Sequence, residues 1–227
     1  MGRVEGDGWL VLIGGGEFSF GETLEADRAW LAKSPEGPIG FLPTASGSAD
    51  YPRHFAAYLA EEHRRESELI PIYRERDARR GKNLERIAAV ACVYIGGGVT
   101  DQLLDTLRDT PAGAALLDRL GSGGTVVAIG AAAQALGAMT RSLYGGGAIP
   151  GLGWLRHGGV ETNFDPGHDR RLRQLLRQPA VRWGLGLPAG SALLLGPQGE
   201  TEIVGMAFAL DDPDGDLQVL TQGVETL

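Results

Sequence analysis

The sequence predicts an α/β fold in three layers, with a mostly parallel sheet covered by helices on both faces. Three observations predict it. Short apolar runs alternate with helical patterns between residues 9 and 130. These runs are apolar throughout, which is typical of strands buried on both faces of a parallel sheet. Glycine-rich turns follow several of the runs, at the carboxyl ends where such sheets carry their ligand sites.

The elements of this first part can be placed in order. Five strands are expected, at Trp9–Ile13, Ile39–Thr44, Leu69–Tyr73, Val90–Ile95 and Thr125–Ile129. Pro71 indicates that the third strand lies at a sheet edge, because proline has no N–H to donate to a neighbouring strand. Helices are expected at Glu22–Ala32, at Pro52–Arg65 and at Thr100–Leu107.

The pattern changes after about residue 150, where the apolar runs become shorter. Strands are expected at Val160–Phe164, Val181–Leu187, Ala192–Leu195 and Glu202–Phe208, and one helix at Gly167–Arg177. No linker, repeat or low-complexity segment interrupts the chain. We therefore expect a flexible N-terminus, residues 1–8, followed by a single domain over residues 9–227.

Composition excludes several classes of protein. No run approaches the roughly 18–20 apolar residues of a membrane span, and the polar N-terminus has no signal-peptide core. The single cysteine, Cys92, excludes an internal disulfide framework. The net charge of −8 argues against a nucleic-acid partner. A basic cluster over residues 74–82 is interleaved with acids and predicts a solvated loop or helix face. We expect a cytoplasmic protein that binds neither membrane nor nucleic acid.

Residues 126–135 resemble a nucleophile elbow without a nucleophile. An apolar strand ends in a glycine and a run of alanines follows directly, as in the strand–turn–helix unit that exposes a catalytic Ser or Cys. In the pattern small-x-nucleophile-x-small, Gly130 takes the first small position and Ala132 the nucleophile position. Gln134 takes the second small position. A methyl group cannot attack a carbonyl, so this site predicts no acyl transfer.

Other motifs give no cofactor or metal site. A dinucleotide fingerprint starting at Gly14 would need glycine at position 19, which is Ser19. The histidines are His54, His63, His157 and His168. No pair of them has the helix-face spacing of a zinc site. The glycines 96–98 before a helix are equally consistent with an anion cradle and with a tight turn.

Taken together, five segments resemble the cyanophycinase and aspartyl dipeptidase (dipeptidase E) family of serine peptidases, which shares its fold with class I glutamine amidotransferases. In chain order they are Gly14–Glu17, Pro43–Ser46, Tyr94–Leu103, Gly151–Leu155 and Val160–Phe164. The resemblance spans roughly residues 9 to 205. It implies a flavodoxin-like three-layer fold and a serine-hydrolase site for Asp-containing or β-aspartyl peptides.

The catalytic positions implied by this resemblance are empty. The family's Gly-Thr-Ser-Ala-Gly-Ala segment places Ala132 at the serine. Its Val-Asp-x-His-Phe segment places Asn163 at the histidine and Glu161 at the aspartate. Its Gly-Ile-Asp-Glu segment meets Pro188 and Ala189, which carry no carboxylate. Serine is a weak nucleophile without a base and a group that orients the base. The resemblance therefore implies a catalytically inactive homologue.

The oxyanion side of the family's site is retained in the sequence. The matching N–H donors are Gly97 or Gly98, and Ala133. The remaining residues expected around the ligand pocket are Glu17, Ser46, Thr100, Gln102 and Gln134. Donors without a nucleophile could hold a small acidic or peptide-like ligand; the alternative is that Gln134 or a neighbour fills the pocket.

Three functions remain open on the sequence. The first is a non-catalytic protein that binds such a ligand or a protein partner. The second is an active hydrolase whose nucleophile has moved to Ser46 or Ser48, with His54 in the following helix as base. The third is a purely structural role, and a homo-oligomer is compatible with each. A Ser–His pair within about 3 Å, beside converging backbone N–H groups, would favour the enzyme.

Overall fold

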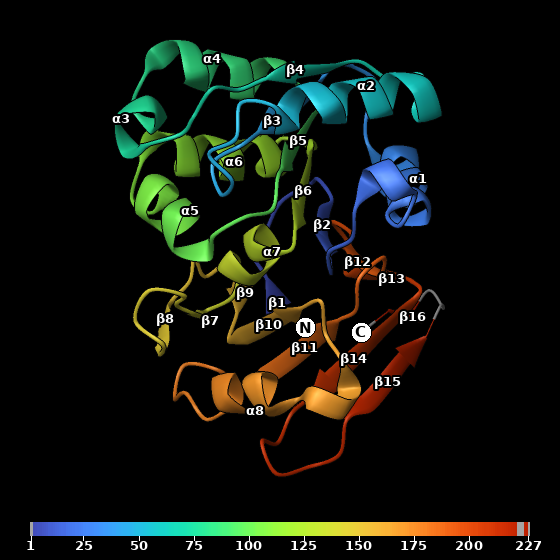
Figure 1. The fold of residues 1–227 in the computed structure, drawn as a ribbon, viewed down its shortest axis with the longest axis vertical. Coiled ribbons are helices and arrows are strands. Elements are labelled where there is room, and N and C mark those ends of the chain that lie inside the picture. Colours follow the sequence, from blue (N-terminus) through green and yellow to red (C-terminus); the bar gives the residue numbers. More distant parts are fainter. Residues whose placement is uncertain (1, 222–224, 227) are drawn as a thin grey trace.

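An eight-stranded mixed sheet forms the centre of the fold (Figure 1). The computed structural model describes residues 2–221 and 225–226. Five neighbouring strands of this sheet are parallel: β4 (Ser67–Leu69), β3 (Ile39–Leu42), β5 (Cys92–Ile95), β6 (Thr125–Ile129) and β2 (Leu10–Ile13). The prediction of a parallel sheet through residue 130 is therefore confirmed.

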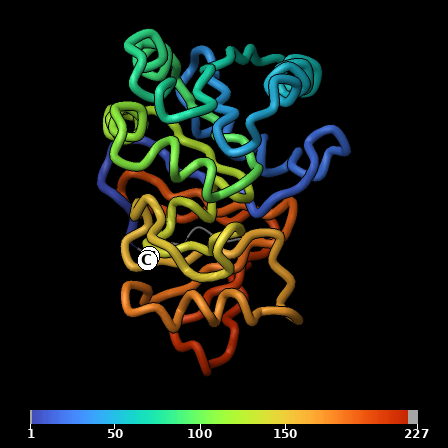
Figure 2. Tube along the Cα trace, turned by 60° about the vertical axis from the view of Figure 1, so that its left-hand side comes forward, coloured from blue at the N-terminus to red at the C-terminus, as the bar shows by residue number. Residues whose placement is uncertain are grey.

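The C-terminal part of the chain extends this sheet and builds a second one (Figure 2). The antiparallel strands β12 (Ala192–Leu195), β13 (Glu200–Val204) and β16 (Glu225–Thr226) continue the first sheet beyond β2. The second sheet has the order β15 (Gln218–Thr221), β14 (Met206–Leu210), β11 (Trp183–Leu187), β10 (Gly158–Thr162), β7 (Met139–Arg141), β8 (Ala148–Pro150). A two-stranded ribbon joins β1 (Gly2–Arg3) to β9 (Leu155–Arg156).

Helices cover both faces of the first sheet, as predicted (Figure 1). One face packs against α1 (Leu24–Lys33) and α2 (Tyr51–His63), and the other against α4 (Gly81–Ala89), α5 (Thr100–Leu107) and α6 (Pro111–Gly121). Side chains of a strand alternate between faces. In β2, Val11 and Ile13 accordingly join the α1–α2 core, whereas Leu10 and Leu12 join the opposite one. Because every residue of such a strand is apolar, its side chains contribute to a hydrophobic core on each face of the sheet.

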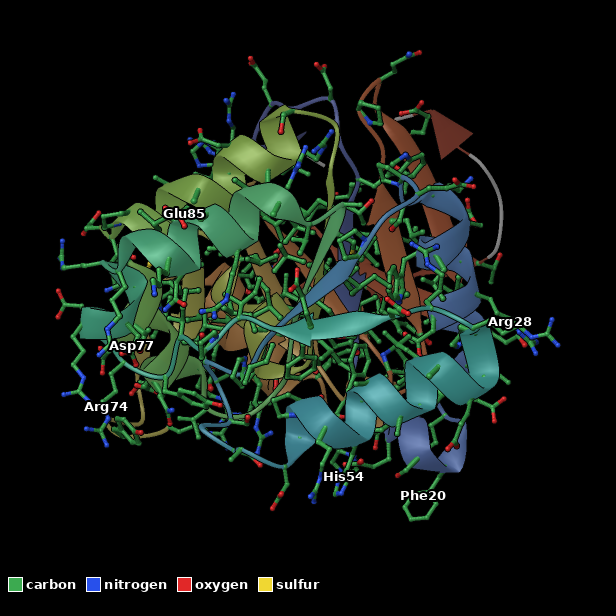
Figure 3. All side chains as sticks on the ribbon, turned by 90° about the horizontal axis from the view of Figure 1, so that it is seen from above. Phe20, Arg28, His54, Arg74, Asp77 and Glu85 are labelled. Atoms are coloured by element: carbon green, nitrogen blue, oxygen red, sulfur yellow. The ribbon has the colours of Figure 1, made fainter. Side chains whose placement is uncertain are left out.

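The remaining helices are short. They are the 3₁₀ helices η1 (Phe18–Phe20) and η2 (Pro166–His168), and the α-helices α3 (Glu75–Ala78), α7 (Ala131–Ala135) and α8 (Arg170–Leu176). The predicted basic cluster lies on and around α3, where Arg79 pairs with Glu75 on an exposed helix face. Arg74 lies across the molecule from Phe20 in Figure 3. No helix in the described part of the chain is long and apolar enough to cross a bilayer.

Several element boundaries differ from the sequence prediction. The third strand ends at Leu69, two residues before Pro71, although it does lie at the sheet edge. The run 202–208 is broken at Gly205, whose φ of 72° turns the chain from β13 into β14. These two strands belong to different sheets. Helices α3, α4 and α6 were not predicted. Residues Gly2–Arg3 pair with β9; the division into a flexible N-terminus and one domain stays a prediction.

A buried carboxylate ties α1 to α2. Asp27 is fully buried. It accepts hydrogen bonds from the Thr23 hydroxyl at 2.7 Å, the Trp30 indole N–H at 2.8 Å and the Tyr58 hydroxyl at 2.7 Å. Desolvation raises the pKa of Asp27, and the three hydrogen bonds offset part of that effect.

This raised pKa predicts a pH-dependent stability. The folded chain keeps the Asp27 proton at pH values where the unfolded chain, with an Asp pKa of about 3.9, has lost it. The Asp27 contribution to the free energy of unfolding should therefore fall as pH rises from about 4 through the raised pKa, and then level off. We expect Asp27→Asn to flatten this fall in urea denaturation between about pH 4 and 8. An unchanged slope in the variant would contradict the assignment.

Candidate functional site

A sharp turn at Gly130 connects the central strand β6 to α7. Gly130 has φ 57° and ψ −120°, and its N–H donates to the Ile13 carbonyl oxygen at 2.9 Å. Such a conformation is strained for any residue with a side chain. A Cβ atom built on Gly130 would nevertheless meet no atom within 4 Å. The turn therefore has the strand–turn–helix geometry of a nucleophile elbow, with open space in front of it.

The structure corrects the predicted position of this turn. Ala132 was expected at its tip, but it is the second residue of α7 and is fully buried. The turn falls on Gly130 because the apolar strand runs through Ile129 and glycine adopts a positive φ most readily. The small residues on either side are then Ala128 and Ala132. Ala132 therefore lies within α7, where its small side chain allows close packing.

A cavity of about 710 Å³ opens in front of Gly130. It lies at the carboxyl ends of β2, β5 and β6, as expected for a parallel sheet. Its lining residues are Gly15, Gly16, Glu17, Phe18, Ser19, Glu22, Ser48, Asp50, Tyr51, His54, Gly97, Gly98, Ile129, Gly130, Ala131, Asn163 and Ala189. The cavity is therefore open and not filled by Gln134.

Residues from the second sheet close one side of this cavity. Asn163 follows β10 with φ 48°, and its N–H donates to the Gly14 carbonyl oxygen at 2.6 Å. Ala189 follows β11; its neighbour Pro188 does not line the cavity. At Gly130, Asn163 and Ala189 the chain thus presents a hydrogen atom, an amide and a methyl group. None of these three can take a proton from a hydroxyl group at neutral pH.

Backbone N–H donors border the same space. Gly97 and Gly98, in the glycine turn after β5, line the cavity. The Gly97 N–H lies against the Tyr51 hydroxyl oxygen, and burial raises the pKa of Tyr51 to about 12. Ala131 also lines the cavity and begins α7, so its N–H has no partner within the helix. Ala133, the predicted second donor, is fully buried.

The other predicted pocket residues divide into two groups. Glu17 lines the cavity, whereas Thr100, Gln102, Gln134 and Ser46 lie outside it. The Thr100 hydroxyl lies 3.4 Å from both the Ala131 carbonyl oxygen and the Gln134 side-chain oxygen. The Gln102 amide donates to the Thr44 carbonyl oxygen at 3.0 Å. These residues support the turns that border the cavity.

Glu161, at the position of the family's aspartate, lies outside the cavity in front of Gly130. It is buried and lines a neighbouring cavity of about 560 Å³, which shares Asn163 with the first.

Among the described residues, no group of three or more His, Cys, Asp or Glu side chains is arranged to hold a metal ion.

The model of peptidase family S51 matches residues 10–144. The chain belongs to peptidase family S51. The resemblance inferred from the sequence is thereby confirmed. The S51 match includes the turn at Gly130 but ends before Asn163 and Ala189, which only the structure brings to the same cavity.

Two solved structures share the fold of this S51 chain. A peptidase from an acI-B1 Actinobacterium has a TM-score of 0.78 at 22% identity, and the match covers 98% of this chain and 99% of that one. A protein from Listeria monocytogenes EGD-e, provisionally named peptidase E, has a TM-score of 0.61 at 14% identity, with 87% and 96% covered. No protein in the curated set matches this sequence.

The serines proposed as alternative nucleophiles have backbone partners. The Ser46 hydroxyl donates to the Pro43 carbonyl oxygen at 3.1 Å. The Ser48 hydroxyl accepts the N–H groups of Asp50 and Tyr51, each at 3.2 Å, at the start of α2. His54 lines the cavity and projects from α2 on the same side of the molecule as Phe20 (Figure 3). Within residues 2–221 and 225–226, no serine hydroxyl is hydrogen-bonded to a histidine.

The acidic part of the cavity wall was not expected from the sequence. Glu22 and Asp50 line it, and the Glu22 carboxylate accepts the Glu17 N–H at 2.8 Å. Both lie in the connections that follow β2 and β3. The rule that sites gather at carboxyl ends of parallel strands could have included these two connections.

Proposed function

We propose that this chain is a non-catalytic member of family S51 that binds a peptide-like ligand in the cavity in front of Gly130. One observation carries the proposal: Gly130, Asn163 and Ala189 line one open cavity, and none of them carries a catalytic group. Gly130 takes the nucleophile's place because it is the strained residue between strand and helix. Loss of nucleophile, base and acid together removes the whole acyl-transfer unit.

The lining of the cavity favours a peptide-like ligand over an acidic one. The N–H groups of Gly98 and Ala131 border it and suit a carbonyl oxygen of the ligand, whereas the Gly97 N–H is held by the Tyr51 hydroxyl group. Its charged lining residues include Glu17, Glu22 and Asp50, and no Lys or Arg is found among the described residues that line it. These acids would repel a carboxylate side chain of the ligand and attract the amino terminus of a peptide.

A second candidate is a hydrolase with a relocated nucleophile. Ser48, Asp50 and His54 all line the same cavity, which brings a hydroxyl, a carboxylate and an imidazole to one space. Against it, the Ser48 hydroxyl already caps the start of α2 through two backbone N–H groups. This geometry favours a structural role for Ser48.

Thermal unfolding with dipeptides, together with a hydrolysis assay, tests the proposal. We expect neutral dipeptides to raise the melting temperature without being cleaved; ligand at about 100 times its dissociation constant adds about 2.7 kcal/mol. Asp-containing and β-aspartyl dipeptides should also remain intact. Gly130→Leu should abolish the shift by entering the cavity. Gly123→Leu is the matched control, because Gly123 also has a positive φ and open space around it, outside the cavity.

Two outcomes would contradict binding without catalysis. If no dipeptide shifts the melting temperature of the unmodified chain, the cavity is not a peptide site. If a dipeptide is cleaved and Ser48→Ala abolishes the cleavage, the relocated nucleophile is correct.

A further inference from the structure

A third, smaller cavity is lined by arginines. It has a volume of about 290 Å³ and lies between α8 and the β7–β8 hairpin, which are neighbours in Figure 1. Three guanidinium groups line it, those of Arg141, Arg171 and Arg177. Gly146 and Gly147 of the hairpin loop and the amides Gln174 and Gln178 complete the polar lining. It shares no residue with the cavity in front of Gly130.

Arg141 lacks the partners that a partly buried arginine normally has. It is the last residue of β7 and is half-buried. Its Nε atom is shielded from solvent and has no hydrogen-bond partner. In the part of the chain that the structure describes, the Arg141 side chain forms no hydrogen bond or ion pair, although its charge opposes the desolvation that raises the pKa of the Glu161 carboxyl. A shielded donor without an acceptor is costly, so an acceptor supplied from outside the chain would stabilise this site.

The charges around the cavity leave room for an anion. Arg171 lies 3.7 Å from the buried Glu161 carboxylate, which is longer than a hydrogen bond, and Arg177 pairs with Asp214 at 2.7 Å. Three guanidinium groups against these two carboxylates leave one net positive charge, although the chain as a whole carries −8. Neither Glu161 nor Asp214 lines the cavity itself.

Arg173 of α8 is, by contrast, an arginine whose hydrogen-bond partners all lie within the chain. Arg173 is held by the Asp169 carboxylate and by the carbonyl oxygens of Pro213 and Gly215, at 2.7–2.9 Å. It does not line the cavity. Arg141, in contrast, lines the cavity and its Nε atom has no partner, which points to a ligand rather than to a structural role.

We propose that this cavity binds the phosphate group of a small molecule. A guanidinium group offers several N–H donors in one plane and binds oxyanions through paired hydrogen bonds. Arg141 supplies the donors without a partner, and Arg171 and Arg177 supply further positive charge. The glycines of the hairpin loop have no side chains to obstruct the approach of a ligand.

Titration with inorganic phosphate tests this site. We expect a saturable rise in melting temperature and a saturable ³¹P line broadening, neither of which sodium chloride at equal ionic strength reproduces. Arg141→Gln should weaken phosphate binding at least about tenfold. Arg141→Lys should weaken it too, because Lys keeps the charge but loses the planar donors. Arg170→Gln, at an exposed position on α8 outside the cavity, should bind phosphate like the unmodified chain.

The possible results separate this site from the peptide site. Equal shifts with sodium chloride, saturation by acetate but not by phosphate, or unchanged binding in Arg141→Gln would each overturn the phosphate assignment. If Arg141→Gln does not fold, Arg171→Gln makes the same test. Dipeptide binding should be unchanged in the Arg141 variants, so either proposal can fail without the other.

Discussion

Gly130→Ser, Asn163→His and Ala189→Glu together should make the chain react with a fluorophosphonate, and none of the three alone should do so. The serine hydroxyl would enter the open space in front of the turn, the histidine would supply the base, and the glutamate would orient it. Triad members act as a unit, and losing one can cost about as much as losing all, on the order of 10⁶ in kcat. Labelling of the triple variant is therefore expected to exceed that of each single variant by orders of magnitude.

Ala132→Ser is the matched control for this experiment. Position 132 is fully buried, so its hydroxyl should remain unlabelled even with histidine and glutamate present. Serine at position 130 must adopt a positive φ, which costs about 1–3 kcal/mol, so the melting temperature of each variant should be measured first. Two outcomes count against our interpretation. Labelling of Gly130→Ser alone would reveal a base already beside the turn, and labelling at position 132 would restore the register expected from the sequence.

The error in this register has a physical origin. In the register expected from the sequence the second small position falls on Gln134; shifted by two residues, the pattern small-x-nucleophile-x-small falls on Ala128, Gly130 and Ala132, which are all small. The glycine was assigned to the first small position, and residue size alone does not show which residue stands at the turn. The backbone does, because only Gly130 has the positive φ of the turn. The expected N–H donor moves by two residues as well: the Ala131 N–H, rather than the Ala133 N–H, borders the cavity.

The parts of the fold that were predictable depend on local patterns. Strands β2, β3, β5 and β6 are buried on both faces and read directly as apolar runs. The second sheet could not be derived in this way. Its strands are joined by long-range pairing, such as Gly159 with Met139 and Gly184 with Leu210. The same long-range pairing brings Arg141 to α8, so no spacing in the sequence indicated the arginine-lined cavity.

Gly14→Ala should be among the most destabilising single substitutions near the site. A Cβ atom at Gly14 would overlap the carbonyl oxygens of Pro188 and Leu187, and backbone atoms cannot move aside as a flexible side chain can. Gly14 also joins the two sheets: its N–H donates to the Ser191 carbonyl oxygen at 2.8 Å, and its own carbonyl oxygen accepts the Asn163 N–H at 2.6 Å. We expect a loss of about 3 kcal/mol, or about 6–12 °C in melting temperature.

The same substitution should also weaken ligand binding, because the segments that Gly14 holds carry Asn163 and Ala189 into the cavity. Gly81→Ala is the matched control: a Cβ atom at Gly81, the first residue of α4, meets nothing within 4 Å, and its φ is not positive. This variant should unfold within about 0.5 kcal/mol of the unmodified chain. If Gly14→Ala were equally harmless, the end of β2 and the segments after β10 and β11 would not be in the close contact that forms this wall of the cavity.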